Sequence, residues 1–188
     1  MGNDSSLPTL YRTTGFEKRQ EMEKSRIISK GQAKVYDALG PSVGFLVSPT
    51  EVNAPYCIME GRIPAGFSVP LHHHPDDESF YIISGKVKVW REDAGWSTLE
   101  KGDFVHVPAG MKHAWKNDAK EPNVGVIVTT PRLGSFFLEA GRPIEPGREQ
   151  SPPTPEDFKR FTEVAARYNH WVGSPGENAS IGIAIDIP

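Results

Sequence analysis

Short apolar runs alternate with turn residues through the central part of the chain. Between Tyr36 and about Thr130, runs rich in Val, Ile, Phe and Tyr are separated by pairs such as Gly40-Pro41 and Ser84-Gly85. Branched and aromatic residues favour strands, whereas Gly and Pro mark turns. The pattern predicts strands at residues 43–47, 56–63, 68–74, 78–83, 86–91, 97–99, 103–107, 113–116 and 124–130. Short strands at this spacing indicate an all-β sandwich or barrel.

The pattern changes after the predicted barrel. Thr154 is a helix-capping residue followed by Pro155 and two acidic residues, which predicts the start of a helix. Apolar residues then recur on one helical face, which we expect to pack on the barrel: Phe158, Phe161, Ala165 and Tyr168.

Isoleucines alternate with small or polar residues at the end of the chain, at positions 181, 183, 185 and 187. This period predicts a half-buried strand. Such a strand needs a partner, either in its own sheet or in a second subunit. We therefore expect a homodimer.

A chain of 188 residues, 37% hydrophobic, can bury one sizeable core but is short for two domains. We expect an N-terminal extension over residues 1–35, a barrel over residues 36–132, and helices with a terminal strand over residues 133–188.

Charge and cysteine content exclude several classes of protein. The 21 basic and 24 acidic residues give a net charge of -3, so neither nucleic acid nor an anionic membrane is an expected partner. Cys57 is the only cysteine, which excludes an intrachain disulfide and a cysteine-based zinc cluster. We expect Cys57 to be a small buried hydrophobic residue. The sequence has neither a secretory apolar segment near its start nor a run long enough to span a membrane, which favours a soluble, cytoplasmic protein.

Candidate chemistry lies on the predicted strand 68–74. Residues two apart on a strand share a face, so His72 and His74 point the same way and His73 points the opposite way. The turn at residues 75–77 is followed by Glu78, and an antiparallel return would place this carboxylate beside the two imidazoles.

A second turn, at residues 108–110, precedes His113 on a strand distant in sequence. Three imidazoles and one carboxylate suit a divalent transition metal with open coordination positions for a substrate. Imidazole donors disfavour Mg²⁺ and Ca²⁺, and the ligand set does not choose among Fe, Mn, Ni, Co, Cu and Zn.

The same residues carry a resemblance to a known family. The stretches GFSVPLHHHPDDESFYIISG, from Gly66, and GDFVHVPAGMKHAWKN, from Gly102, resemble the two motifs of the cupin superfamily. The ten matching positions are Gly66, His72, His74, Glu78, Gly85, Gly102, Pro108, Gly110, His113 and Asn117. The resemblance implies a double-stranded β-helix, or jelly-roll barrel, of the small single-domain type, with a short C-terminal helical extension. It also implies one metal held by His72, His74, Glu78 and His113.

Strand alternation suggests which residues lie beside the metal. Phe80 and Ile82 follow Glu78 inward, and Trp115 follows His113, so these side chains form either the pocket wall or the barrel core. His106 is a further pocket candidate because it adjoins the second motif. Two other histidines, His73 and His170, are expected at the surface, and the acids of the turn at residues 75–77 either face water or orient a ligand histidine.

The site favours an enzyme with a small-molecule substrate. The ligand set resembles that of quercetinase-type cupins, which implies a dioxygenase acting on a phenolic or enolic compound, with Glu78 as the catalytic proton acceptor. The alternatives are a redox-neutral cyclase, isomerase, lyase or decarboxylase, and a non-catalytic binder.

Overall fold

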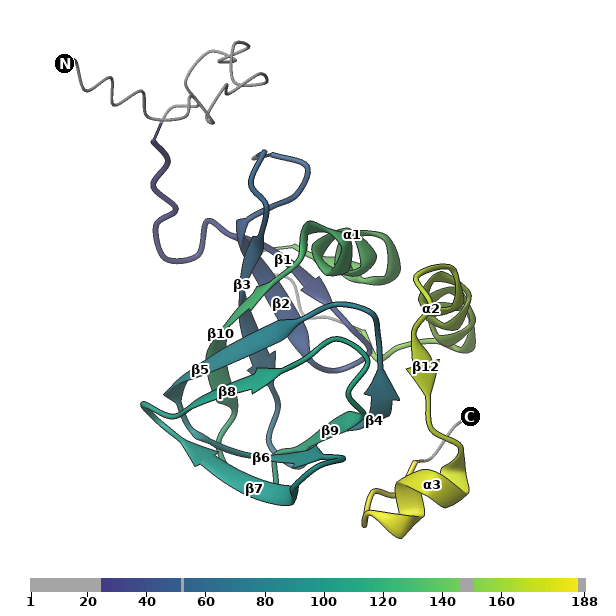
Figure 1. The fold of residues 1–188 in the computed structure, drawn as a ribbon. Coiled ribbons are helices and arrows are strands. Elements are labelled where there is room, and N and C mark those ends of the chain that lie inside the picture. Colours follow the sequence, from purple (N-terminus) through teal and green to yellow (C-terminus); the bar gives the residue numbers. More distant parts are fainter. Residues whose placement is uncertain (1–24, 52, 146–150, 186–188) are drawn as a thin grey trace, which may run out of the picture.

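The computed structural model describes residues 25–51, 53–145 and 151–185. Two antiparallel sheets face each other and form a barrel (Figure 1). The seven-stranded sheet has the order β11-β1-β2-β3-β10-β5-β8, and the five-stranded sheet has the order β12-β4-β9-β6-β7. The strands are β1 (Lys34–Asp37), β2 (Ser42–Val47), β3 (Cys57–Ile63), β4 (Ser68–His73), β5 (Glu78–Ser84), β6 (Lys86–Arg91), β7 (Gly95–Glu100), β8 (Phe104–Val107), β9 (His113–Lys116), β10 (Asn123–Thr129), β11 (Arg142–Ile144) and β12 (Trp171–Val172).

The jelly-roll architecture is confirmed, and the strands predicted between residues 43 and 130 are confirmed with ends that differ by one or two residues. The strands β1, β11 and β12 were not predicted. Each is short and lies at or beside a sheet edge, where few apolar positions are needed.

Alternating side chains from both sheets fill the barrel interior. The buried cluster contains Ile82, Val87, Val89, Leu99, Val105, Val107 and Trp115. These residues sit two apart within β6 and within β8, as expected for strands with one face turned inward. The apolar interior supports the strands that carry the candidate site.

Three helices follow the barrel: α1 (Pro131–Ala140), α2 (Pro155–Arg167) and α3 (Pro175–Ser180). The predicted start of α2 is confirmed, because the Thr154 side chain caps it and Asp157 completes a capping box. The helix α1 was not predicted as a helix.

The helix α2 was expected to pack on the barrel, but it packs on another helix instead. The apolar face of α2 packs against α1, where Val164 and Ala165 meet Leu133 and Phe136. The two helices lie side by side at one end of the barrel (Figure 1). A strongly amphipathic helix needs an apolar partner, and α1 supplies it.

The predicted terminal strand is also wrong over residues 181–185, while Ile187 lies outside the described residues. Ser174 caps the helix α3, and Gly182 follows it with a φ of 79°, which interrupts an extended backbone. Ile183 is buried against Leu71 and Ala114 of the five-stranded sheet. The isoleucines at 181, 183 and 185 therefore cover their own sheet without joining it.

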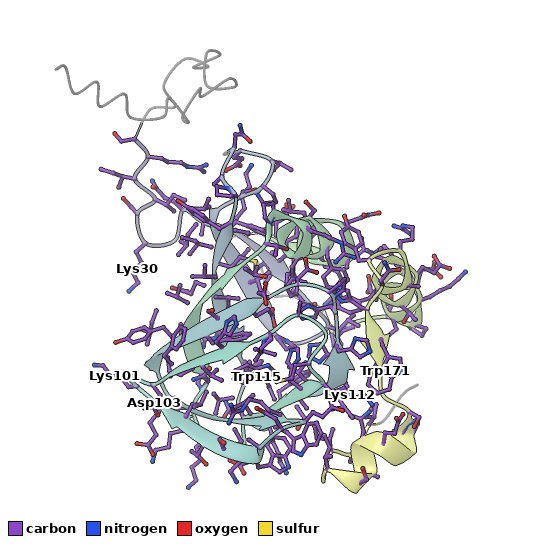
Figure 2. The ribbon with its side chains drawn as sticks, viewed as in Figure 1. Lys30, Lys101, Asp103, Lys112, Trp115 and Trp171 are labelled. Atoms are coloured by element: carbon purple, nitrogen blue, oxygen red, sulfur yellow. The ribbon has the colours of Figure 1, made fainter. Side chains whose placement is uncertain are left out.

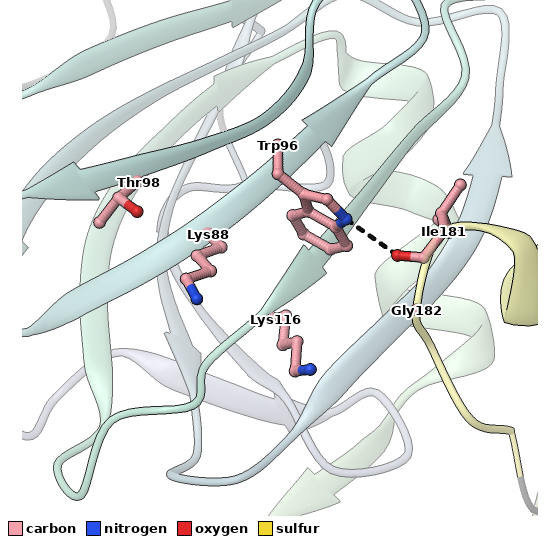
Figure 3. Close-up of a pocket in the computed structure, with 6 residues that line it drawn as sticks. All are labelled: Lys88, Trp96, Thr98, Lys116, Ile181 and Gly182. Atoms are coloured by element: carbon pink, nitrogen blue, oxygen red, sulfur yellow. Dashed lines mark hydrogen bonds between the residues drawn. The ribbon is translucent and has the colours of Figure 1, made fainter.

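The same segment borders a pocket on the outer face of the five-stranded sheet. Trp96 Nε1 donates a hydrogen bond to the Ile181 carbonyl at 2.8 Å (Figure 3). The lining residues are Lys88, Trp96, Thr98, Lys116, Ile181 and Gly182.

Within the described part of the chain, no helix is both long enough and apolar enough to cross a membrane.

Candidate metal centre

Three histidines meet because β4 and β9 are neighbours in the five-stranded sheet. The register pairs His72 with His113, and their ring centroids lie 4.1 Å apart. His74 extends just beyond β4, on the same side as His72. One ring nitrogen from each of the three lies within 4.8 Å of the others. Separations of this size let one ion contact all three, so the three histidines could bind a metal.

Hydrogen bonds fix the two turns that lead into the site. The amide of Gly110 donates to the carbonyl of His74 at 2.8 Å, and the amide of Ala109 donates to Asp77 Oδ1 at 3.0 Å. The two turns are distant in sequence but bonded directly to each other. These hydrogen bonds hold the turn before His113 against the turn before Glu78.

Glu78 begins β5 and is buried beside two of the imidazoles. Its Oε2 lies 3.3 Å from Nε2 of His74 and 3.3 Å from Nε2 of His113. The antiparallel return expected from the sequence therefore brings the carboxylate to the histidines. The four residues of the predicted ligand set therefore lie close together in the fold.

Backbone carbonyls set the tautomers of two of the rings. Nδ1 of His72 donates to the Pro70 carbonyl at 2.7 Å, and Nδ1 of His113 donates to the Met111 carbonyl at 2.9 Å. A carbonyl oxygen only accepts, so each neutral ring carries its proton on Nδ1 and offers a lone pair at Nε2.

The resulting arrangement suits a cation. Nε2 of His113 is buried and has no hydrogen-bond partner, although Oε2 of Glu78 lies close to it. A lone pair facing a carboxylate oxygen in a buried site is unfavourable unless a proton or a metal ion lies between them. The residues present therefore fit a divalent metal of the kind that imidazole and carboxylate bind.

Burial and neighbouring charges shift the pKa values of these groups in different directions. Burial alone would raise the pKa of Glu78, but its contacts with His113 and His74 outweigh burial and hold the pKa below its usual value. Burial, with the nearby His113 and His74, holds the pKa of His72 well below its usual value. Glu78 is thus ionised and His72 neutral near pH 7.

His74 differs from the other two histidines. Burial lowers its pKa, but Glu78 and Asp76 together raise it by more, so the net shift is upward. Its Nδ1 is buried without a hydrogen-bond partner and lies 3.9 Å from Oδ2 of Asp76. Asp76 is itself buried and accepts hydrogen bonds from Thr130 and Arg132, each at 2.5 Å. Of the two possibilities for the turn acids, Asp76 lies beside the candidate ligand His74, whereas Asp77 is exposed.

The predicted pocket residues do not share one environment. Phe80 packs on Trp115 with ring centroids 4.4 Å apart, and Trp115 lies inside the barrel (Figure 2). Ile82 is only 2% exposed and belongs to the core. His106 was wrongly placed in the pocket, because it faces outward from β8 and its Nδ1 lies 3.0 Å from Ser79 Oγ. Alternation along β8 turns its neighbouring valines inward instead.

Two histidines expected at the surface are partly buried. His73 stacks on Trp171 of β12 at 5.2 Å, and Lys112 lies over the Trp171 ring at 4.7 Å (Figure 2). His170 packs 5.0 Å from the His74 ring and 4.1 Å from Phe136. Burial, with the nearby His74, lowers the pKa of His170 to about 3. No spacing in the sequence relates His170 to the motifs, so its position became visible only in the fold.

Comparisons with known proteins agree with this geometry. A family model described as the cupin domain matches residues 59–129. Quercetin 2,3-dioxygenase of Bacillus subtilis is 28% identical over 91 residues, which cover 48% of this chain and 27% of the relative. The dimethylsulfoniopropionate lyase DddQ of Ruegeria pomeroyi is 36% identical over 52 residues, which cover 28% of this chain and 26% of the relative. The chain thus spans about a quarter of the length of the curated relatives it matches.

A solved structure shares the fold over a larger part of the chain. The polyketide cyclase RemF from Streptomyces resistomycificus aligns with a TM-score of 0.53 and 13% identity, over 75% of this chain and 99% of the cyclase. At this identity the likeness describes the fold alone.

Proposed function

The chain belongs to the cupin superfamily through its domain at residues 59–129, and on this basis we propose that it is a metal-dependent enzyme. We propose a dioxygenase whose substrate is a small phenolic or enolic compound. His72, His74, Glu78 and His113 would hold one divalent transition metal, chosen from Fe, Mn, Ni, Co, Cu and Zn.

One observation carries this proposal. The lone pair of His113 Nε2 faces a carboxylate oxygen of Glu78 at 3.3 Å in a buried site. A cation between them removes the repulsion and satisfies both atoms. His72 supports the same position, because its proton lies on the opposite side of the ring, at Nδ1.

When bound, the metal would supply a Lewis acid that lowers the pKa of a coordinated hydroxyl group. We assign the role of proton acceptor to the Glu78 carboxylate, through the oxygen that does not face the metal. The packed Phe80 and Trp115 side chains supply apolar surface toward the barrel interior and limit the entry of water from that side. The turns joined through Ala109 and Gly110 keep these groups at fixed separations.

The relatives support two reaction classes. The match to a dioxygenase extends over 91 residues and therefore covers more of this chain than the other. The match to a lyase is shorter, at 52 residues, but more similar at 36% identity. This second match favours a redox-neutral lyase, cyclase, isomerase or decarboxylase as the second candidate, with Glu78 again moving the proton.

Metal analysis of the purified protein, combined with an oxygen electrode, tests the proposal. Compounds with phenolic or enolic hydroxyl groups are screened with the metal-loaded protein in air and under anaerobic conditions. A dioxygenase consumes oxygen with its substrate and stops without oxygen. Turnover that is indifferent to oxygen identifies the redox-neutral class.

Two variants separate catalysis from binding. Glu78→Gln removes the proton acceptor and should abolish turnover, whereas a non-catalytic binder keeps its ligand affinity in this variant. His106→Ala is the matched control, because His106 faces outward and should leave turnover unchanged. A protein that binds no divalent metal would refute the proposed function.

A further inference from the structure

His74 is the predicted ligand histidine whose ring has no orienting hydrogen bond at Nδ1 within the described structure. Nδ1 of His72 and Nδ1 of His113 each donate to a backbone carbonyl, and these bonds orient the two rings. Nδ1 of His74 is buried and makes no hydrogen bond to any residue that the structure describes. A metal-binding imidazole usually donates its other N–H to a fixed acceptor, which sets the tautomer and the ring plane.

Asp76 is the carboxylate that lies beside His74 Nδ1, but both of its oxygens already accept hydrogen bonds. Its Oδ2 lies 3.9 Å from His74 Nδ1, beyond hydrogen-bond distance. Oδ1 accepts from Thr130 and Oδ2 accepts from Arg132, each at 2.5 Å. Both partners belong to the start of α1, so Asp76 is held toward that helix.

His170 also has a ring nitrogen without a partner. Its Nε2 is buried and makes no hydrogen bond among the described residues. Its ring lies 5.0 Å from the His74 ring at a tilt of 36° and also packs on the apolar ring of Phe136. Two adjacent imidazoles therefore each hold one unpartnered nitrogen, and a neutral imidazole provides one donor and one acceptor.

The backbone on both sides of His170 is anchored. Before it, the Tyr168 carbonyl accepts a hydrogen bond from Arg132. After it, β12 pairs with β4, with Trp171 opposite His73, and Gly173 N donates to the Leu71 carbonyl at 2.7 Å. The pairing with β4, the strand that carries His72 and leads into His74, thus holds His170 beside His74.

We propose that His170 is a positioning residue of the metal centre: its Nε2 accepts a hydrogen bond from Nδ1–H of His74 when that ring binds the metal through Nε2. This inference rests on the proposed metal binding, and it makes the segment between α2 and β12 part of the centre.

The test is a titration of the metal-free full chain with Co²⁺. Binding is measured by calorimetry and by the visible absorption of bound Co²⁺. In His170→Gln, the amide oxygen can take the place of Nε2, whereas in His170→Asn the shorter side chain reaches only the place of Nδ1. The dissociation constant for Co²⁺ should rise about 10-fold or more in His170→Asn. It should stay close to the wild-type value in His170→Gln.

Tyr168→Leu is the packing control. Tyr168 packs on Phe136 at 5.7 Å and belongs to the same apolar cluster, but its ring is not paired with His74. This variant should lower the melting temperature while leaving the Co²⁺ affinity unchanged. A merely structural role for His170 predicts the opposite pattern, in which all three variants change stability and none changes affinity.

Three results would overturn the inference. Equal Co²⁺ affinity in wild type and His170→Asn removes the role of His170. A loss of affinity in Asp76→Asn, with none in His170→Asn, assigns the orienting role to Asp76. If the wild-type chain binds no Co²⁺ or other divalent metal, the proposed function fails and this inference fails with it.

Discussion

Nε2 of His113 lies 3.3 Å from Oε2 of Glu78, although the proton of the His113 ring is on Nδ1, where it bonds to Met111. Two buried acceptors at this distance repel each other unless a proton or a metal ion lies between them. The same pair becomes favourable around a cation. A metal ion between the two atoms would therefore satisfy both of them.

Metal binding should stabilise the fold. With free metal at about 100 times its dissociation constant, linkage adds about 2.7 kcal/mol, which raises the melting temperature by about 5 to 10 °C for a chain of this size. Differential scanning calorimetry with and without a chelator measures this shift. His113→Ala should lose it, while the outward-facing His106→Ala should keep it. An equal shift in both variants would place the metal elsewhere.

Asp76→Asn should destabilise the protein. The buried carboxylate accepts from both Thr130 and Arg132, and an amide keeps only one acceptor and turns an N–H toward the guanidinium. We expect a loss of about 1 to 3 kcal/mol in urea unfolding. Asp77→Asn is the control, because its remaining amide oxygen can still accept from Ala109. Similar losses in both variants would contradict a special role for Asp76.

Gly134→Ala should strain the contact between α1 and β3. A Cβ atom at this position would lie 2.6 Å from Sγ and 3.1 Å from Cβ of Cys57. Overpacking of this kind costs about 1 to 3 kcal/mol. Gly176→Ala in α3 should be neutral or slightly stabilising, because a Cβ atom there meets nothing within 4 Å. Thermal unfolding of the two variants compares them directly, and a neutral Gly134→Ala would mean that α1 moves freely against the sheet.

Cys57 predicts a pH dependence at the alkaline end. As expected from the sequence, the thiol is buried, and burial raises its pKa from 9.0 to about 11. Between these two pKa values the unfolded chain loses the thiol proton first, so the folded state binds more protons and its stability falls as pH rises. The thiol alone accounts for a fall of about 2 to 3 kcal/mol between pH 9 and pH 11.

The comparison with Cys57→Ala isolates this term, since other groups titrate in the same range. The variant should have a shallower loss of stability above pH 9, whatever its stability at neutral pH. Parallel curves for the two proteins would show that the thiol contributes nothing.

Asn178→Ala should loosen the C-terminal segment. This buried amide accepts from the Leu71 amide at 2.7 Å and donates to the carbonyls of Gly173 and Ser174. Truncation leaves the Leu71 N–H without its partner inside the protein, at a cost of about 1 to 3 kcal/mol. Hydrogen exchange at Leu71 should become faster. Unchanged protection of this amide would be inconsistent with the contact.

Much of the barrel and of the site could be predicted from local rules. Alternation on β4 put His72 and His74 on one face, and the turn before Glu78 returned the chain to them. The same rule was available for β8, where buried valines on both sides of His106 turn it outward. The pocket assignment of His106 relied on closeness to a motif in sequence, and side-chain direction overrides such closeness.

Local sequence rules predicted less of the structure in the C-terminal part of the chain. Ser174 and Glu177 form a capping box of the same kind as Thr154 and Asp157, and the helix that begins there ends where the isoleucine period starts. His170 could not be found in this way. Its place depends on α2 packing against α1 and on β12 reaching β4, and neither contact leaves a period in the sequence.

The bond between Leu71 and Asn178 joins residues 107 positions apart. During synthesis on a ribosome, the strands that carry the histidines and Glu78 emerge long before this partner does. A nascent barrel therefore passes through a stage in which the outer edge of β4 is bare and open to strand pairing with neighbouring chains. This edge is completed only after the helices α1 and α2 have been synthesised.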